Sequence, residues 1–398
     1  MARSKKKQKK RSTWTKRRHA IVFALLRPIL RLYFRLRYNY KAQHSGLGKS
    51  AYLIISNHQT TMDPFLLSLS FRFPIYFVAS DDLFNLKVSP LINYLVAPIP
   101  KSKSLCDVAA MMGVLRVIKE GGAVGIFPEG NRTVSGGQWE MTDAIAKLAK
   151  KLKVPLVIYN ICGGYGTDPR WGHSIRKGRA SGGVRRIISV EELSTLSNEQ
   201  LFTLIKEELM VNDTESGISF RSRKRAEFIE RALYMCPICH KISGIVSHKS
   251  KFECKYCGTG AVYTKKLTIS PAIAGFERIY DWYEWEKREI VKAVIEGMQI
   301  EDGGILFRES VKFKRKKKLD GDRVSIDKDK LVIYSKKQEQ VFMLAKIVAL
   351  TMVGKKKFNF YYEDKILQVK GNKRFCAIKY VHIFDSLQHL NSEDIKED

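Results

Sequence analysis

Residues 52–71 read YLIISNHQTTMDPFLLSLSF. In this stretch a short apolar run, Tyr52–Ile55, precedes a polar loop and an apolar segment, Phe65–Phe71, with helical spacing. Further runs of both kinds alternate along the chain: strand-like at Ile75–Val78, Val96–Ile99, Val124–Phe127 and Leu156–Ile161, and helix-like at Val108–Glu120 and Ala144–Leu152. This alternation predicts an α/β domain with a largely parallel sheet.

The loop after the first predicted strand carries a histidine and a carboxylate. Ligands of open α/β sheets gather at loops beyond the strand ends, so His58 and Asp63 are candidates for a base and the group that orients it. On a regular helix the two would point about 140° apart, but a loop can fold His58 back onto Asp63. The alternative is structural: Asp63 before Pro64 is also an ordinary helix N-cap, beside a loop histidine.

A second loop, Phe127-Pro-Glu-Gly-Asn-Arg-Thr133, follows another predicted strand. Arg132 offers a bidentate fork for phosphate, and Gly130 lets the backbone approach an anion closely. By itself the segment is also compatible with a Pro-Gly turn and a charge pair between Glu129 and Arg132. Two such loops at strand ends favour a functional site.

Asn57-His58-x4-Asp63 followed by Phe127–Thr133 resembles the lysophospholipid and glycerol-phosphate acyltransferase family, and most of all its 1-acyl-sn-glycerol-3-phosphate acyltransferases. The resemblance covers Lys41–Leu193. It implies that His58 deprotonates the acceptor hydroxyl and that Asp63 orients His58.

The same resemblance implies that Glu129, Gly130 and Arg132 shape the site and hold the acceptor phosphate. Lys101 stands where the family's second block presents a basic residue, more commonly arginine, and is a candidate phosphate contact.

The reaction implied by the resemblance is transfer of a fatty acyl group from acyl-CoA or acyl-ACP to the sn-2 hydroxyl of 1-acylglycerol 3-phosphate (lysophosphatidic acid). The product is phosphatidic acid, and no acyl-enzyme forms. One alternative is an acyltransferase for another lysophospholipid or for glycerol 3-phosphate. The other is a nucleic-acid or protein binding module with an inactive acyltransferase-like core. Because His58, Asp63 and Arg132 are all present, we expect an enzyme and do not expect nucleic acid as a partner.

Positive charge is concentrated at the N-terminus. The net charge is +31, and residues 1–50 hold 16 Lys or Arg with no Asp or Glu. This stretch includes the basic tract Lys5–Arg11. Such a balance points to an anionic partner such as a membrane, a phosphorylated substrate or nucleic acid.

Residues 20–38, AIVFALLRPILRLYFRLRY, predict an amphipathic helix whose arginines at 27, 31 and 35 share one face. Pro28 suits a first helical turn or a kink. Ala20–Leu26, the best apolar run, is far shorter than the roughly 20 residues that span a bilayer. We therefore expect residues 1–44 to bind membrane phospholipids at the cytoplasmic face, in a peripheral or monotopic manner. A core helix with a solvated arginine face, or a nucleic-acid contact, remains open.

Four of the seven cysteines form two C-x2-C pairs, Cys236/Cys239 and Cys254/Cys257, separated by fourteen residues. This spacing is typical of a zinc ribbon with four thiolate ligands, which leave no open position for catalysis. The alternative is two metal-free pairs of buried thiols. We expect structural zinc.

The region after the cysteines predicts a helix over Ala272–Gly297 and then mostly strands. These lie at Ile305–Phe313, Arg323–Ile326, Lys330–Tyr334, Gln340–Phe342, Ile347–Val353, Lys357–Tyr362 and Lys365–Lys370, before a final helix, Cys376–Leu390. Seven strands and a helix resemble a PH- or GRAM-like β domain. Its basic run Lys312–Lys318 is compatible with headgroup contact or with a solvated hairpin.

The predicted organisation has five parts: a basic tail and membrane helix (1–44), an acyltransferase domain (45–220), a zinc ribbon (221–265), a helical linker (266–300) and a PH/GRAM-like β domain (301–398).

Overall fold

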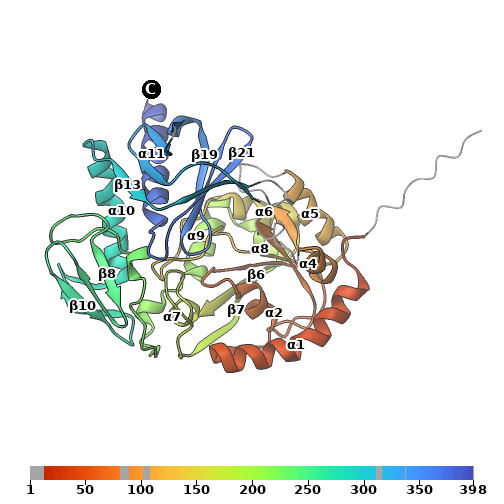
Figure 1. The fold of residues 1–398 in the computed structure, drawn as a ribbon. Coiled ribbons are helices and arrows are strands. Elements are labelled where there is room, and N and C mark those ends of the chain that lie inside the picture. The colour runs from red at the N-terminus through yellow and green to blue at the C-terminus, as the bar shows by residue number, and fades with distance from the viewer. Residues whose placement is uncertain (1–12, 81–88, 102–107, 311–315, 337, 398) are drawn as a thin grey trace, which may run out of the picture.

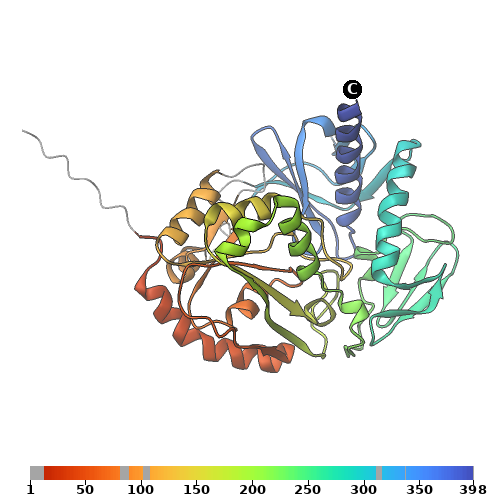
Figure 2. The same cartoon turned by 180° about the vertical axis from the view of Figure 1, so that it is seen from behind.

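The structure is a computed structural model that describes residues 13–80, 89–101, 108–310, 316–336 and 338–397. The tract Lys5–Arg11, residues 312–315 of the second basic run and Cys106 lie outside these ranges. In both views of Figures 1 and 2, α1 runs along one edge of the molecule and α11 lies at the opposite end.

A seven-stranded sheet forms the N-terminal half, and every neighbouring pair in it is parallel except β6/β7. The predicted largely parallel sheet is therefore confirmed. In spatial order its strands are β1 (Tyr40–Ala42), β7 (Ala180–Ile188), β6 (Leu156–Cys162), β2 (Leu53–Ser56), β5 (Ala123–Ile126), β3 (Ile75–Ser80) and β4 (Ile99–Lys101).

Helices cover both faces of this sheet, because successive strand residues point to opposite sides. On β2, Leu53 and Ile55 join one buried cluster while Ile54 joins the other. The first face packs against α5 (Val108–Lys119), α6 (Ala144–Leu152), α8 (Val190–Thr195) and α9 (Asn198–Leu209). The second packs against α1 (Arg17–Tyr38) and α2 (Asp63–Ser68). A strand buried on both sides reads as a continuous apolar run.

Two predictions at this end of the chain are wrong. Pro28 is not in a first helical turn, because α1 begins at Arg17 and continues through it. Pro28 and Ala24 are both exposed, so water can satisfy the carbonyl that loses its helical donor. Val96 does not open a strand: it ends α4 (Ser89–Val96), and β4 begins at Ile99. Pro90 near the start of α4 suits a first helical turn.

The cysteine region forms a separate antiparallel sheet of five strands. Its order is β12 (Phe276–Arg278), β11 (Thr268–Ile273), β10 (Gly260–Tyr263), β9 (Lys251–Cys254) and β8 (Ile245–His248). The sheet thus continues past residue 265, and the helix expected from Ala272 begins only at Ile279 as α10 (Ile279–Ile295). A short helix, α7 (Gly164–Thr167), precedes this region in the chain and lies between β6 and β7.

The C-terminal region is β-rich, as predicted, and consists of two antiparallel sheets and a terminal helix, α11 (Ile378–Glu397). One sheet has the order β13 (Ile300–Gly303), β16 (Arg323–Ile326), β17 (Lys330–Tyr334) and β18 (Glu339–Met343). The other has β15 (Lys317–Lys318), β14 (Leu306–Glu309), β21 (Lys365–Lys370), β20 (Lys357–Tyr362) and β19 (Ile347–Met352). Its PH-like character stays a prediction.

One buried cluster joins the halves of the molecule. It includes the ribbon's Phe252, Trp282 on α10, and Tyr380 on α11. Tyr165 and Trp171, which follow β6 in the N-terminal domain, belong to the same cluster. The ribbon and the C-terminal region are therefore packed against the α/β domain through a shared apolar core.

Candidate active site

The loop between β2 and α2 brings His58 and Asp63 together. The Nδ1 atom of His58 lies 2.8 Å from Oδ2 of Asp63. Asp63 is the first residue of α2 and is fully buried. The four intervening residues form a turn, not a helix, which is what lets the two side chains meet.

The Asp63 carboxylate is held by the same turn. Its Oδ2 accepts hydrogen bonds from the backbone N–H of Gln59 (2.6 Å) and Thr60 (2.9 Å). The Thr60 hydroxyl donates to Oδ1 at 2.7 Å. A carboxylate accepting this many bonds is an acceptor only, so Nδ1 of His58 carries the proton that it shares with Asp63. The second ring nitrogen, Nε2, is then unprotonated.

The environment of His58 keeps its ring neutral. Desolvation lowers its pKa, and this outweighs the bond to Asp63, which raises it; the charges of Arg132 and Arg170 lower it further. The ring stacks on Phe127 with centroids 4.4 Å apart. The side chain still has 19% exposure, and no described residue hydrogen-bonds Nε2. A neutral imidazole with a free Nε2 can accept a proton from a bound hydroxyl.

Glu129 ties the two loops together. Its Oε1 accepts from the backbone N–H of His58, and its Oε2 accepts from that of Trp139, each at 2.9 Å. The backbone N–H of Thr133 donates in turn to the carbonyl of His58 at 2.9 Å. Burial raises the pKa of Glu129 to about 8, while the two N–H donors act in the opposite direction. With both oxygens committed to backbone, Glu129 shapes the site and does not face a ligand. Gly130, beside it, has φ +63° and is exposed, where a side chain would be strained.

Arg132 lies on the open side of this arrangement. Its Nη1 donates to the hydroxyl of Thr61 at 2.7 Å, and the residue is half-buried. Burial lowers the pKa of its guanidinium, whereas Asp63 and Asp168 favour the charged form. No described carboxylate forms an ion pair with Arg132, so its remaining donors can serve an anionic group.

Lys101 reaches the same edge of the sheet but not the same cluster. It is exposed at the carboxyl end of β4, which is separated from β5 by β3. Two strand spacings amount to about 10 Å. Within the described part of the chain, Lys101 forms no hydrogen bond with His58, Glu129 or Arg132.

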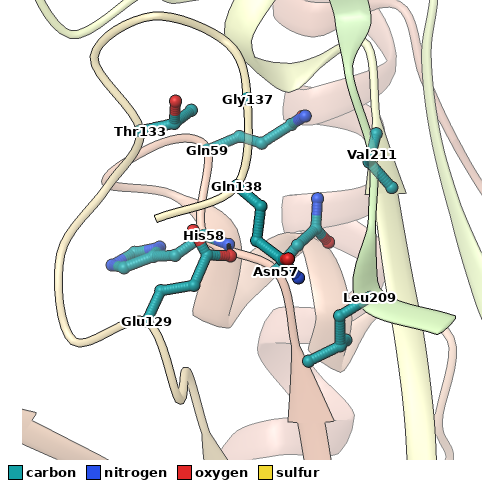
Figure 3. A pocket seen from close by; sticks show the side chains of 9 residues that line it. All are labelled: Asn57, His58, Gln59, Glu129, Thr133, Gly137, Gln138, Leu209 and Val211. Carbon is teal, nitrogen blue, oxygen red and sulfur yellow. Dashed lines mark hydrogen bonds between the residues drawn. The ribbon is translucent and has the colours of Figure 1, made fainter. Parts of the chain in front are cut away.

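Two buried amides in the first loop fix its position. Asn57 exchanges two hydrogen bonds of 2.8 Å with the backbone of Ile161 at the end of β6. Gln59 accepts the backbone N–H of Gly164 at 2.8 Å. Nothing in the sequence indicates this role of Gln59 beyond its place in a polar loop. Both line a small pocket at the loop between β2 and α2, and Figure 3 shows the His58 ring turned away from Leu209 and Val211 on the other side of this pocket.

The structure also gathers the four paired cysteines. Their sulfur atoms all lie within 4.8 Å of one another. The Sγ–Sγ separation is 3.7 Å both for Cys236 to Cys257 and for Cys239 to Cys254. Four sulfurs bound at about 2.3 Å to one tetrahedral ion stand roughly 3.8 Å apart, whereas a disulfide needs about 2.05 Å. The residues fit a zinc ion.

Comparison with known proteins shows what the part of the chain around this site is similar to. Residues 35–161 match the model of the acyltransferase family. A probable 1-acyl-sn-glycerol-3-phosphate acyltransferase of Mycoplasma pneumoniae is 28% identical over 127 residues, which is 30% of this chain and 48% of the relative. The 1-acyl-sn-glycerol-3-phosphate acyltransferase of Borreliella burgdorferi is 28% identical over 120 residues, 28% of this chain and 47% of the relative. The chain thus spans about half the length of the curated relatives it matches.

A solved structure covers a similar part of the chain. It is the crystal structure of the 1-acyl-sn-glycerophosphate (LPA) acyltransferase PlsC from Thermotoga maritima, with a TM-score of 0.40 and 19% identity over 48% of this chain and 78% of that one. His58, Asp63, Glu129 and Arg132 all lie within the residues that match the family model. The part of this chain that holds these four side chains is therefore similar to the acyltransferase family.

Proposed function

We propose that the chain transfers a fatty acyl group from an acyl thioester to a hydroxyl of a phosphorylated lysolipid. The observation that carries the proposal is the bond between His58 and Asp63, which leaves Nε2 of a neutral imidazole free beside Arg132. Within an acyltransferase-family domain, this geometry supports direct attack by the acceptor hydroxyl. It also speaks against an inactive acyltransferase-like core.

In this mechanism Nε2 of His58 removes the proton from the acceptor hydroxyl as its oxygen attacks the thioester carbonyl. The buried Asp63 stabilises the imidazolium that forms. The tetrahedral intermediate then collapses with cleavage of the carbon–sulfur bond, and His58 returns the proton to the thiolate. No acyl-enzyme is needed, because the substrate supplies the nucleophile.

The acceptor we propose is lysophosphatidic acid, with phosphatidic acid as the product. The names of the curated relatives and the phosphate-binding chemistry of Arg132 support it. The test is an acyl-transfer assay that offers lysophosphatidic acid, lysophosphatidylcholine and glycerol 3-phosphate with acyl-CoA or acyl-ACP. Absence of transfer to every acceptor would overturn the proposed function, and preference for another acceptor would replace the proposed substrate.

We expect Arg132→Ala to raise KM for lysophosphatidic acid by about tenfold to a hundredfold, with a smaller change in kcat. A charge-assisted hydrogen bond to phosphate contributes about 1.5–3 kcal/mol. Steady-state kinetics with a monoacylglycerol acceptor, which has no phosphate, serve as the control. An unchanged KM for lysophosphatidic acid would remove Arg132 from the phosphate site.

We further propose that α1 docks on the cytoplasmic face of a membrane. No described helix is long and apolar enough to cross a bilayer. However, five large apolar side chains at spacings of three or four residues are exposed along α1: Ile21 (53%), Leu25 (66%), Ile29 (63%), Leu32 (61%) and Leu36 (77%). Beside this stripe, Arg27, Arg31 and Arg72 line a hollow with Phe23, Ala24 and Pro28. Such a helix lies in the interface plane with its apolar stripe in the acyl boundary. Arg27 and Arg31 each donate a hydrogen bond to the carbonyl of Leu69.

The docking proposal predicts that Leu25→Glu/Ile29→Glu weakens binding to anionic vesicles about a hundredfold. Two apolar side chains leave the bilayer, a loss of roughly 3 kcal/mol. Cosedimentation with phosphatidylglycerol vesicles measures the effect. The matched control is Ile187→Glu/Met210→Glu, which adds the same charge at exposed apolar positions off the stripe. Equal binding by both double variants would contradict docking through α1.

We also propose that Cys236, Cys239, Cys254 and Cys257 hold a structural zinc ion. The sulfur separations of 3.7 Å support it. Four thiolates close the coordination sphere, so the ion would fold the ribbon and take no part in acyl transfer.

A further inference from the structure

A single buried arginine links the loop of Arg132 to the C-terminal region. Arg170 donates from Nη1 to the carbonyl of Arg132 (3.0 Å), from Nε to that of Gly354 (2.9 Å) and from Nη2 to that of Met352 (2.8 Å). Arg170 is 2% exposed. Since one guanidinium spans these three carbonyls, the turn between β19 and β20 is fixed directly against the second loop of the site.

The turn between β19 and β20 also carries Lys355, whose side chain contacts the segment that contains Arg170. Nζ of Lys355 donates to the carbonyl of Gly172 at 2.7 Å and lies 3.9 Å from Oδ1 of Asp168. The other oxygen of Asp168 accepts the Tyr38 hydroxyl at 3.4 Å. The Lys355 side chain is 37% exposed, so its ammonium, with three N–H groups, is not saturated.

The charges of Lys355, Asp168 and Arg132 act on one another. Burial lowers the pKa of Lys355, Asp168 raises it, and Arg132 is among the cations that lower it further. Asp168 in turn favours the charged form of Arg132. The three nitrogens of Arg170 are committed to carbonyls, so Arg170 adds positive charge here but its bonded N–H groups are not available to a ligand. Lys355 therefore offers a second cation that interacts with Arg132 and whose N–H donors are not all committed, which suits a phosphate dianion.

We propose that Lys355, a residue of the C-terminal region, is a second cation of the acceptor-phosphate site. The phosphomonoester held by Arg132 also contacts Lys355, which exchanges part of its interaction with Asp168 for the ligand. This inference rests on the proposed function and deepens it, because it makes the C-terminal region a determinant of the acceptor. A phosphomonoester then binds better than an acceptor without that group.

The test compares Lys355→Gln with Lys356→Gln in the full chain. Lys356 is the next residue of the same turn, but its charge interactions are with Lys370, Arg231 and Lys373 and do not include Arg132. We expect Lys355→Gln to raise KM for lysophosphatidic acid about tenfold, the effect of one charge-assisted hydrogen bond. We expect kcat, and KM for monoacylglycerol, to change less than about twofold. Lys355→Arg should restore most of the KM, and Lys356→Gln should resemble the parent.

Two results would overturn the inference: an unchanged KM for lysophosphatidic acid, or equal losses with both acceptors, which would indicate a structural tether only. Calorimetric titration with short-chain lysophosphatidic acid separates this inference from the proposed function. If the ligand binds and Lys355→Gln weakens binding about tenfold, the site stands even when no acyl transfer is found. If transfer occurs and Lys355→Gln leaves affinity intact, the inference fails and the proposed function stands.

Discussion

Replacing His58 with alanine is expected to lower kcat/KM for acyl transfer by a factor of about 10³. A positioned general base contributes roughly 10²–10⁴ to the rate, and water admitted into the space of the ring is a poor substitute. The fold should survive, because Asp63 keeps its bonds from Gln59 and Thr60 after the imidazole is removed. Initial rates with lysophosphatidic acid and acyl-CoA measure the loss, and circular dichroism checks the fold.

The matched control for that variant is His44→Ala. His44 is exposed and accepts one hydrogen bond, from the backbone N–H of Gly46, so its loss should leave the rate within about twofold.

The parent enzyme should also show kcat/KM rising with pH and levelling above an inflection below 6.5. Protonation disables the base, and desolvation lowers the pKa of His58. Normal activity in well-folded His58→Ala would exclude this mechanism.

Loss of the metal from the cysteine cluster should have the largest effect on stability. Structural zinc sites in small ribbons carry an apparent binding free energy of about 10–16 kcal/mol, much of it coupled to folding. Cys254 is 1% exposed and belongs to the same apolar core as Trp282 and Tyr380. We expect Cys254→Ser to remove the ion and to lower Tm by roughly 10 °C or more, since about 1 kcal/mol shifts Tm by 2–4 °C in domains of 150–250 residues.

Native mass spectrometry and a thermal melt with and without 1,10-phenanthroline test this expectation. The parent should carry one zinc per chain and lose stability on chelation. Cys162→Ser is the control, because Cys162 is free and lies outside the cluster. Equal Tm and metal content in Cys254→Ser and Cys162→Ser would show that the cysteines do not hold a structural ion.

The sequence predicted those elements whose bounds depend on residues close together in the chain. The strands at Arg323–Ile326, Lys330–Tyr334, Lys357–Tyr362 and Lys365–Lys370 have the predicted bounds, because alternation and turn residues mark them. Strand β7 was missed, since two glycines and two arginines in ASGGVRRII hide its alternation. The helix expected from Ala272 starts at Ile279 because the preceding residues form the hairpin of β11 and β12, which completes the ribbon sheet.

Part of the candidate site could also be predicted from the sequence, because some of its contacts are local. His58 and Asp63 are close in the chain, so one turn decides their contact. Glu129 was expected to help shape the site, but its bonds to two backbone N–H groups depend on how separate loops meet. The hydrogen bonds of Arg170 to Gly354 and of Lys355 to Gly172 each join residues about 180 positions apart in the chain. No periodicity or motif in a single sequence records such a contact.

The shared core has a consequence for how this protein can be divided. Val134, Tyr165 and Trp171 are almost completely buried against the ribbon and the C-terminal region. A chain cut after residue 220 would present these side chains to water, at a cost of about 25 cal/mol for each Å² of newly exposed apolar surface. An exposed patch of this kind promotes self-association. The acyltransferase-like segment and the C-terminal half are thus expected to fold and to stay soluble only as one unit.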